Sequence, residues 1–397
     1  MKSLLILGRQ PALGLAELES LYGAEAIIVI GKGGALLDID PTDVNFERLG
    51  GSIKHARVIH ILDSTKWRAV EDYLSDTILQ LTTALPNGKI RLGISAYGLR
   101  VKASDINITG LRLKKIIKND GRSVRIVPNK QPELNSAQVL HNQLTGQTGI
   151  EIVVARYGEQ TVIATTVAEQ DIEAYAKRDQ ARPARDAKVG MLPPKLAQII
   201  VNLSAKDEGI NPVSEQMVLD PFCGTGVVLQ EALLMGYLVH GSDIEPRMID
   251  YTQKNINWLS SIHGYKGALL TLEVGDATSH DWLVANIVDS IACETYLGKP
   301  FTSLPPQKLL ETARSECDEI HEKFLRNIGS QIESGTRLCL AVPAWKTKTG
   351  FLHLKTLAKL EQLGYTRKKF VHVREQDLIY FREDQVVARE LVVLEKK

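Results

Sequence analysis

The residues best suited to chemistry surround a glycine-rich stretch near the middle of the chain, Asp220-Pro221-Phe222-Cys223-Gly224-Thr225-Gly226. An apolar run precedes this stretch, and residues 227–234 follow it at helical spacing. The pattern predicts a strand, a glycine turn and a helix, which form the first unit of a doubly wound nucleotide-binding sheet. Glycine suits such a turn because any Cβ would collide with a ligand lying against the backbone.

Asp243 ends the next apolar run, 17 residues beyond Gly226. An acidic group at this place accepts hydrogen bonds from the two ribose hydroxyls of an adenosine. A dinucleotide site needs a third glycine three positions after Gly226, where this chain has Leu229. Asp220, just before the turn, favours a positively charged ligand instead. S-adenosylmethionine fits this description, because its tail carries an ammonium group and its sulfonium is positive.

The composition is that of an ordinary globular protein. The chain has 397 residues, enough for two or three domains, with 44% hydrophobic and 24% charged residues. No apolar run approaches the roughly 20 residues that cross a bilayer, and the opening residues are too short for a secretory signal. The four cysteines have no paired spacing, so neither a disulfide framework nor a metal site is expected. We expect a cytoplasmic protein without a membrane partner.

The formal net charge is only +1, but the cations are unevenly distributed. Nine of them lie between Leu99 and Lys130 against two acidic residues. Three of these cations occupy roughly one face of a helix expected over residues 108–119. A solvated surface is the alternative to a surface that binds RNA phosphates. The candidate RNA-binding residues are Arg100, Lys102, Arg112, Lys114, Lys115, Lys118, Arg122 and Arg125.

The order of expected elements indicates an α/β protein. Residues 1–65 and 66–168 each have the pattern of a small α/β unit, and the charged segment 169–190 is expected to be a linker. From residue 191 onwards, strands and helices alternate as in a parallel sheet. Near the end we expect a helix over 351–363, a strand over 369–373, and a last strand over 390–395 that runs antiparallel to its neighbours.

Three motifs, in this order, resemble the cofactor motifs of class I methyltransferases: residues 220–226, Asp243-Ile244 and Gly275-Asp276-Ala277. Four further segments restrict this resemblance to one family within the class: residues 7–11, residues 15–19, Arg182-Pro183 and residues 191–197. Nearly the whole chain is similar to the THUMP-containing tRNA guanine-N2 methyltransferases. This family implies a ferredoxin-like domain over 1–65, a THUMP domain over 66–168, and a Rossmann-like class I methyltransferase domain over 191–397. The last has a seven-stranded sheet with one antiparallel strand.

The resemblance also implies a cofactor, its contacts and a partner. The cofactor is S-adenosylmethionine, with Asp243 on the ribose, Asp276 and Ala277 on the adenine, and Gly224 and Gly226 along the methionine part. The THUMP domain holds the acceptor end of a tRNA. Some members need a small activating subunit, and the oligomeric state stays open. The cofactor-binding residues implied are Asp220, Phe222, Cys223, Gly224, Gly226, Asp243, Ile244, Asp276 and Ala277.

One motif departs from the family. The catalytic motif of the family is Asp-Pro-Pro-Tyr or Asn-Pro-Pro-Tyr before a glycine. At the corresponding place this chain has Glu294-Thr295-Tyr296-Leu297 before Gly298. We expect the Glu294 oxygen to accept a hydrogen from the guanine amine and aim the nitrogen lone pair at the methyl group. We expect the ring of Tyr296 to stack on the extruded base.

This departure leaves alternatives open. The chain is a tRNA guanine-N2 methyltransferase if Glu294 replaces the shorter acid. It is a non-catalytic tRNA-binding protein if catalysis has been lost, or an amino-methyltransferase for another base or for DNA if the target differs. His280 and Cys293 are not spaced as a nucleophile pair, so both are expected to be structural.

Overall fold

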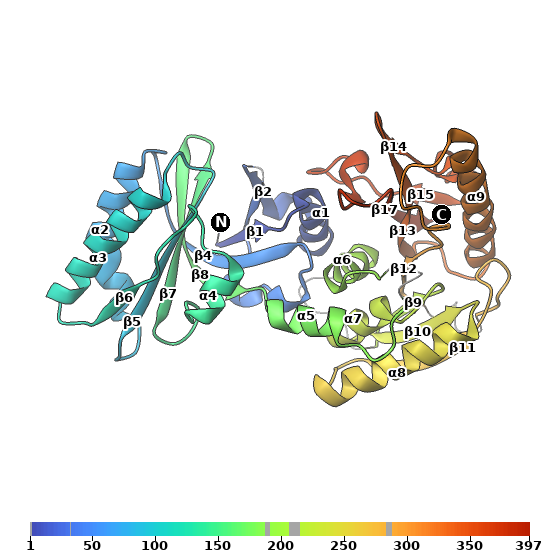
Figure 1. The fold of residues 1–397 in the computed structure, drawn as a ribbon, viewed down its shortest axis with the longest axis horizontal. Coiled ribbons are helices and arrows are strands. Elements are labelled where there is room, and N and C mark those ends of the chain that lie inside the picture. Colours follow the sequence, from blue (N-terminus) through green and yellow to red (C-terminus); the bar gives the residue numbers. More distant parts are fainter. Residues whose placement is uncertain (1, 32, 187–190, 206–214, 283–287) are drawn as a thin grey trace. The chain divides into compact units, whose positions relative to one another are not determined.

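The computed structural model describes residues 2–31, 33–186, 191–205, 215–282 and 288–397 (Figure 1). The chain divides into two compact units. Unit 1 comprises residues 1–11, 25–47 and 52–173, and unit 2 comprises residues 12–24, 48–51 and 174–397.

Unit 1 is built on an eight-stranded mixed sheet with the order β2-β3-β1-β4-β8-β7-β5-β6. Strand β5 is parallel to β6 and β7, and the other pairs are antiparallel. The strands are β1 (Ser3–Leu7), β2 (Ile27–Ile30), β3 (Gly34–Leu37), β4 (Ser52–Leu62), β5 (Ile90–Tyr97), β6 (Val124–Ile126), β7 (Gly149–Tyr157) and β8 (Gln160–Glu169).

Helices α2 (Trp67–Thr83) and α3 (Ala103–Asn119) lie side by side against the sheet of unit 1 (Figure 1). Both bury an apolar residue every three or four positions, which is the stripe that a helix needs to pack on a sheet. In α3 these positions are Ile106, Gly110, Leu113 and Ile117. A third, short helix is α4 (Ser136–His141), capped by the Asn135 side chain, which accepts from the Gln138 amide.

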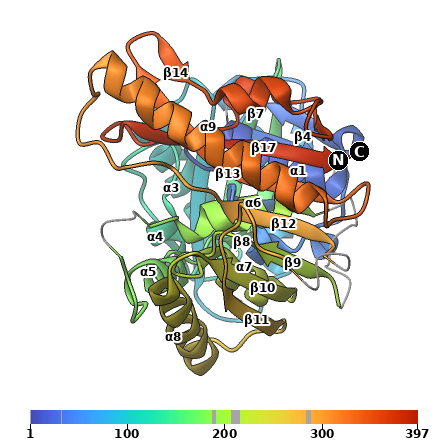
Figure 2. The same cartoon turned by 90° about the vertical axis from the view of Figure 1, so that its right-hand side faces the viewer.

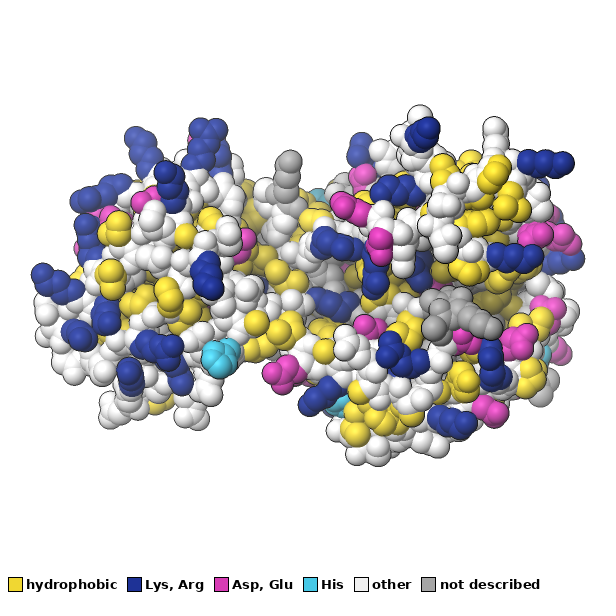
Figure 3. Space-filling view, viewed as in Figure 1, with side chains coloured by type: hydrophobic (Ala, Val, Ile, Leu, Met, Phe, Trp, Pro, Cys, Tyr) yellow, Lys and Arg dark blue, Asp and Glu magenta, His cyan; other side chains and the backbone are white. Residues whose placement is uncertain are grey.

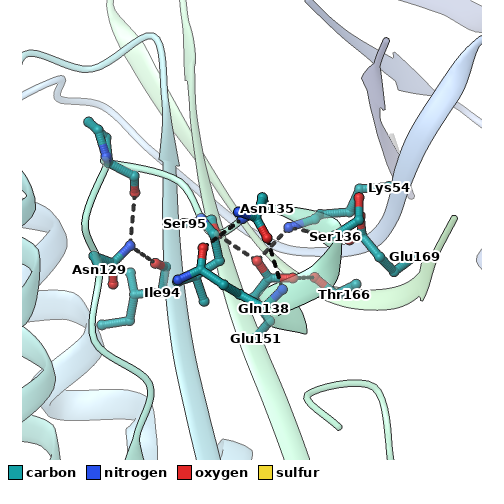
Figure 4. A network of polar contacts seen from close by, with 12 residues as sticks. Lys54, Ile94, Ser95, Asn129, Asn135, Ser136, Gln138, Glu151, Thr166 and Glu169 are labelled. Carbon is teal, nitrogen blue, oxygen red and sulfur yellow. Dashed lines mark hydrogen bonds and ion pairs between the residues drawn. The ribbon is translucent and has the colours of Figure 1, made fainter. Parts of the chain in front are cut away.

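A buried polar network crosses the sheet of unit 1 (Figure 4). The Lys54 amine contacts the carboxylates of Glu151 and Glu169, and all three side chains are 1% exposed or less. The Glu151 carboxylate also accepts from the hydroxyls of Ser95 and Thr166, each at 2.6 Å. Buried charges are tolerated only when they are paired in this way.

Unit 2 contains a nine-stranded sheet whose main path is β11-β10-β9-β12-β13-β17-β15. On this path only β17 runs against the others, as the sequence predicts. The strands are β9 (Met217–Asp220), β10 (Leu238–Asp243), β11 (Ala268–Val274), β12 (Ser290–Glu294), β13 (Arg337–Thr347), β15 (Tyr365–Arg367) and β17 (Val387–Lys396), with the short β14 (Gly350–Leu352) beside β13 and β16 (Ile379–Tyr380) beside β17.

Helices cover both faces of this sheet (Figures 1 and 2). On one face lie α6 (Pro194–Ser204), α7 (Val227–Met235) and α8 (Pro246–Ile262), and on the other lies α9 (Gln307–Gly329). The core on the α9 side joins Phe324 and Ile328 to strand residues such as Leu219 and Leu340. This layered arrangement places the carboxyl ends of β9 to β12 at one edge of the sheet.

An N-terminal helix, α1 (Pro11–Tyr22), belongs to unit 2 from residue 12 onwards. Its buried Glu17 accepts hydrogen bonds from the amides of Gly50 and Gly51, at 2.9 and 2.8 Å, and from Asn202 of α6 at 2.8 Å. The two compact units therefore follow other boundaries than the predicted 65 and 168. The ferredoxin-like and THUMP assignments stay predictions.

Three local predictions are wrong. Residues 172–180 of the expected linker form helix α5 (Ile172–Gln180). The expected helix over 351–363 is replaced by β14, which pairs with β13, and by a short 3-10 turn, Lys355–Lys359. The expected strand over 369–373 is absent among these described residues, because the amides of Val371 and His372 donate to the carboxylate of Glu19.

Candidate active site

A cavity of about 990 Å³ lies at the carboxyl ends of β9, β10, β11 and β12. Eight acidic and four basic residues line it, so its formal charge is strongly negative. The acidic residues are Asp186, Asp220, Asp243, Glu245, Asp276, Glu294, Glu319 and Asp384, and the basic ones are Arg247, Lys299, Lys323 and Arg389. A cavity of this kind favours a cationic ligand.

The glycine loop between β9 and α7 forms one wall of this cavity. Gly224 and Gly226 have φ angles of +51° and +80°, in the region that favours glycine. A Cβ on Gly226 would lie 2.7 Å from the Thr252 methyl group, whereas a Cβ on Gly224 would meet nothing closer than the Phe222 carbonyl at 4.0 Å. Gly226 is thus required for packing, and Gly224 leaves open space on the cavity side.

Two residues of α8 fix the glycine loop. The Thr252 hydroxyl donates to the Gly224 carbonyl at 2.8 Å, and the Asn255 amide donates to the Thr225 carbonyl at 2.9 Å. Asn255 also exchanges hydrogen bonds with the backbone of Ala184. The loop conformation is therefore set by the protein before any ligand binds.

Asp243, at the end of β10, faces the glycine loop. Its carboxylate accepts from the Gly224 amide at 2.9 Å and from the Glu245 amide at 3.0 Å. Burial raises the pKa of Asp243, and these two hydrogen bonds oppose that shift. The carboxylate is held rigidly at the cavity wall, next to the exposed side chain of Ile244.

Asp220 lies deeper, at the end of β9, and is 1% exposed. Its carboxylate accepts from the Phe222 amide at 3.1 Å. Burial raises the pKa of Asp220 well above its usual value, and the charges of Asp243 and Glu294 push it in the same direction. The carboxyl groups of Asp220, Asp243 and Glu294 are therefore close enough for their charges to interact.

The loop after β11 supplies Asp276 and Ala277. The Asp276 carboxylate accepts from the amide and the hydroxyl of Thr278, at 2.9 and 2.8 Å. Ala277 is buried, and its carbonyl accepts from the Asn327 side chain at 3.1 Å. Asn327 of α9 thus fixes the shape of this loop at the cavity wall.

Glu294, at the end of β12, pairs with Arg389 of β17. The Arg389 Nε donates to the Glu294 Oε1 at 2.5 Å, and the two side chains are 8% and 16% exposed. Strand β13 lies between their strands, so the arginine reaches across it. This ion pair fixes the Glu294 carboxylate while one side of it still faces the cavity.

Thr295 points the other way. Its hydroxyl lies 2.6 Å from the His321 Nε2, and the His321 Nδ1 lies 2.6 Å from the Cys317 carbonyl. Burial lowers the pKa of His321 to about 4, so the ring is neutral at pH 7. Its Nδ1–H must then donate to Cys317, and Nε2 accepts from the Thr295 hydroxyl. The contact between Thr295 and His321 fixes the turn after β12, which lacks the prolines of the family motif.

Tyr296 is 37% exposed and lines the cavity with Leu297 and Gly298. Gly298 has a φ of +81° and allows the chain to leave the turn. The cavity thus brings together all the predicted catalytic and cofactor-binding residues: Asp220, Phe222, Cys223, Gly224, Asp243, Ile244, Asp276, Ala277, Glu294 and Tyr296 directly, and Gly226 through the loop.

The residues expected to be structural lack exposed reactive groups. Burial raises the pKa of Cys293 well above the usual thiol value, so it is not a thiolate at pH 7. The same holds for Cys223, the predicted cofactor-binding residue in the glycine loop. The His280 Nε2 lies 3.0 Å from Glu273, whose other neighbour is His240. The described residues include no group of three or more metal-ligating side chains that could hold an ion.

Residues 182–367 match the family model of the RMKL-like methyltransferase domain (UPF0020). The tRNA (guanine(10)-N2)-dimethyltransferase of Methanothermobacter thermautotrophicus is 32% identical over 168 residues, which are 42% of this chain and 43% of the relative. The protein of the same name from Pyrococcus abyssi is 31% identical over 156 residues, 38% of this chain and 39% of the relative. The chain thus spans about two fifths of the length of these curated relatives.

Among solved structures, TrmN from Thermus thermophilus is similar over 100% of both chains, with a TM-score of 0.50 and 18% identity. Together with the domain match, this similarity confirms the predicted α/β class I methyltransferase fold. Within the described parts of the chain, no helix has the length and apolar character needed to cross a membrane.

The candidate RNA-binding residues lie in unit 1, on α3 and its flanks. Lys and Arg side chains spread over this part of the surface with few acidic neighbours (Figure 3). Arg100, Lys102, Lys115, Lys118 and Arg125 are exposed, and Lys114 is half-buried. Two others already have partners. Arg112 pairs with Glu71 at 3.2 Å, and Arg122 donates to the carbonyls at the end of α2.

Sequence reasoning missed Arg389, His321, Thr252 and Asn255. Each is a polar residue at a position that packs inward, in an otherwise apolar strand or on the buried face of a helix. A buried polar residue needs a partner, so such positions were a usable signal. Their partners, however, come from distant parts of the chain.

Proposed function

We propose that this protein is an S-adenosylmethionine-dependent methyltransferase that acts on the exocyclic N2 amine of a guanosine in tRNA. One observation carries the proposal: a single cavity joins the glycine loop and Asp243 to Glu294 and Tyr296. The names of the similar archaeal proteins support the same reaction and substrate. Because those relatives are covered only in part, the activity of the whole chain is inferred from the site.

The residues of the cavity fit S-adenosylmethionine. Asp243 would hold the ribose hydroxyls, Asp276 and Ala277 the adenine, and the open space beside Gly224 would take the methionine part. The surplus of carboxylates suits a ligand with an ammonium and a sulfonium. When bound, this cofactor supplies an electrophilic methyl group.

The chain's own residues then orient the acceptor. The Glu294 carboxylate, held by Arg389, accepts an N–H hydrogen of the guanine amine and turns the nitrogen lone pair towards the donor. Tyr296 stacks on the base, a contact worth about 1–3 kcal/mol. The amine loses a proton as it gains the methyl group, and the Glu294 oxygen that faces the cavity is placed to receive that proton. No covalent intermediate with the protein is needed.

The proposal extends to unit 1 and to partners. We assign unit 1 a THUMP-like role, in which the exposed cations of α3 contact tRNA phosphates. A cytoplasmic location suits a tRNA substrate. A small activating subunit is compatible with the family resemblance.

A second candidate is a tRNA-binding protein without catalysis. It is favoured by the sequence Glu294-Thr295-Tyr296-Leu297 in place of the family's acid and prolines, and by the ion pair that occupies one oxygen of Glu294. An amino-methyltransferase for another base or for DNA would use the same geometry.

The deciding experiment is methyl incorporation from radiolabelled S-adenosylmethionine into total tRNA. Wild type should incorporate label, and Glu294→Ala should lose about 100-fold in rate, as for removal of one fixed polar group at a transition state. The control is Glu322→Ala, an ion-paired glutamate of α9 outside the cavity lining. Cofactor binding by wild type without incorporation would favour the non-catalytic candidate. Nucleoside mass spectrometry of the labelled tRNA identifies the modified base.

A further inference from the structure

A second, smaller cavity of about 370 Å³ adjoins the first within unit 2. It shares Gln385 and Arg389 with the larger cavity. Its lining contains three arginines and one carboxylate, the reverse of the charge balance in its neighbour. The lining residues are Asp179, Gln180, Arg185, Met191, Pro193, Tyr380, Arg382, Gln385 and Arg389. We call this space the arginine cavity.

Two of its arginines have free donor groups. The Arg185 Nη1 donates to the Gln180 carbonyl at 3.2 Å, and the Arg382 Nε donates to the Tyr380 hydroxyl at 3.4 Å. Both side chains are exposed. Among the described residues, neither guanidinium forms an ion pair. The hydrogen bond with Tyr380 and the charges of Asp179 and Asp384 raise the pKa of Arg382, and Asp179 itself pairs with Arg182. The N–H donors of both guanidinium groups that have no partner are available to an anion.

The third arginine connects the two cavities. Arg389 is 7% exposed and uses its Nε–H on Glu294, at 2.5 Å. A guanidinium has five N–H donors in a planar fork, so the remaining ones can serve the arginine cavity. The same side chain can therefore hold the Glu294 carboxylate and contact an anion on its other side.

We propose that the arginine cavity binds a backbone phosphate of the RNA next to the base received by Glu294 and Tyr296. This rests on the proposed function, because it takes RNA as the substrate. A base extruded into the larger cavity leaves its own phosphates at the mouth, within one nucleotide of the base. Arginine recognises phosphate through paired N–H donors. Arg389 then couples the seating of this phosphate to the position of the Glu294 carboxylate.

The test compares Arg185→Ala/Arg382→Ala in the full-length chain with wild type. The probe is fluorescently labelled bulk tRNA, titrated by anisotropy between about 50 and 200 mM salt. Each lost phosphate contact lowers the slope of log affinity against log salt by about 1. Arg185 and Arg382 contact the same phosphate, so the double variant loses one phosphate contact and its slope should fall by about 1. It should therefore lose about fourfold less affinity than wild type over this fourfold salt range. Arg185→Lys/Arg382→Lys should keep the wild-type slope, because both charges remain.

The control is Arg326→Ala/Arg374→Ala, which removes two exposed arginines of unit 2 that lie outside both cavities and are paired with Glu322 and Asp377. Its slope should match wild type. A double variant of the arginine cavity that also keeps the wild-type slope overturns the proposal. So does a variant that keeps this slope but loses binding of inorganic phosphate, since that result would indicate a site for a free anion.

The same proteins separate this proposal from the proposed function. Wild type that shows the arginine-dependent slope but transfers no methyl group supports the arginine cavity and overturns the enzyme. If wild type methylates tRNA and the salt slope is the same with and without Arg185 and Arg382, the proposed function is supported and the arginine cavity is overturned as a phosphate site. Wild type that binds no tRNA overturns both.

Discussion

Two regions of this molecule gather buried carboxylates, and they treat them differently. In the network of unit 1, the Lys54 amine contacts both Glu151 and Glu169. Glu151 is further satisfied by the hydroxyls of Ser95 and Thr166 (Figure 4). Both carboxylates of this network thus have a cationic partner within the sheet.

In the cavity of unit 2, carboxylates outnumber their protein partners. Asp220 has one backbone amide and Asp243 has two. Glu294 pairs with Arg389, Asp186 with Arg247 and Glu319 with Lys323. The negative charge of this cavity is therefore not neutralised by its lining. Carboxylates that are fully paired stabilise a fold, whereas carboxylates left underpaired in a cavity are available to a ligand. Changes in unit 1 should accordingly appear in stability, and changes in unit 2 in binding.

The largest expected effect is in the network of unit 1. Lys54→Met leaves two buried carboxylates without their cation, which should destabilise the fold by about 3–5 kcal/mol. Hydrogen exchange of peptides from β4 and β7 would report the loss where it occurs. The matched control is Lys102→Met, an exposed lysine of the same unit.

A companion variant tests the reason for that loss. Lys54→Met with Glu151→Leu replaces two of the three charges by apolar groups and leaves Glu169 as the only unpaired carboxylate of the network, so it should recover only the part of the loss that Glu151 causes. If the single variant loses less than about 1 kcal/mol, the pairing in this network does not carry the stability assigned to it.

The next effect is a pH dependence. Burial raises the pKa of Glu169 to about 7, against 4.5 as its ordinary value. Between these two pH values the folded state binds more protons than the unfolded state, so stability falls as the pH rises from about 4.5 to about 7 and then levels off. The fall is at most about 3 kcal/mol.

Glu169→Gln should remove this part of the pH dependence, as measured by urea unfolding at several pH values. Glu159→Gln, an exposed glutamate of the β7–β8 turn, is the control. A wild-type curve that rises over this range, with no change in the Glu169 variant, would contradict the assignment.

In the cavity, the same type of change should act on binding. Asp243→Ala should weaken S-adenosylmethionine binding by about 10- to 100-fold, the loss expected for hydrogen bonds to a charged group. Calorimetry measures the affinity, and the unfolding midpoint should move little. Asp250→Ala, an exposed residue of α8, is the control. Equal affinities for both variants would exclude Asp243 from the cofactor site.

The cofactor half of the site was predictable because its signal is local. The motif at 220–226 combines a strand, a turn and a helix within a short segment, and Asp243 ends the next strand. The structure places these residues on one cavity, as the pattern of a doubly wound sheet requires.

The other half depends on contacts between distant residues. Arg389 meets Glu294 only because β13 separates β12 from β17 by one strand, an arrangement that no local pattern encodes. The same reason explains the wrong strand at 369–373, where Glu19 of α1 takes the backbone amides. Local propensity is overridden where a distant partner satisfies the backbone.

The smallest expected effect concerns Gly224. Comparing two glycine variants distinguishes the cost of backbone strain from the loss of space for the ligand. Gly224→Ala places a Cβ at a φ of +51°, which should destabilise the fold by about 1 kcal/mol. Gly264→Ala, at a φ of +64° with nothing within 4 Å, should do the same. Only the Gly224 variant fills space on the cavity side, so only it should also weaken S-adenosylmethionine binding in calorimetry. If both variants bind the cofactor as wild type does, the open space beside Gly224 is not where the ligand lies, and the contrast between the two regions would rest on the carboxylates alone.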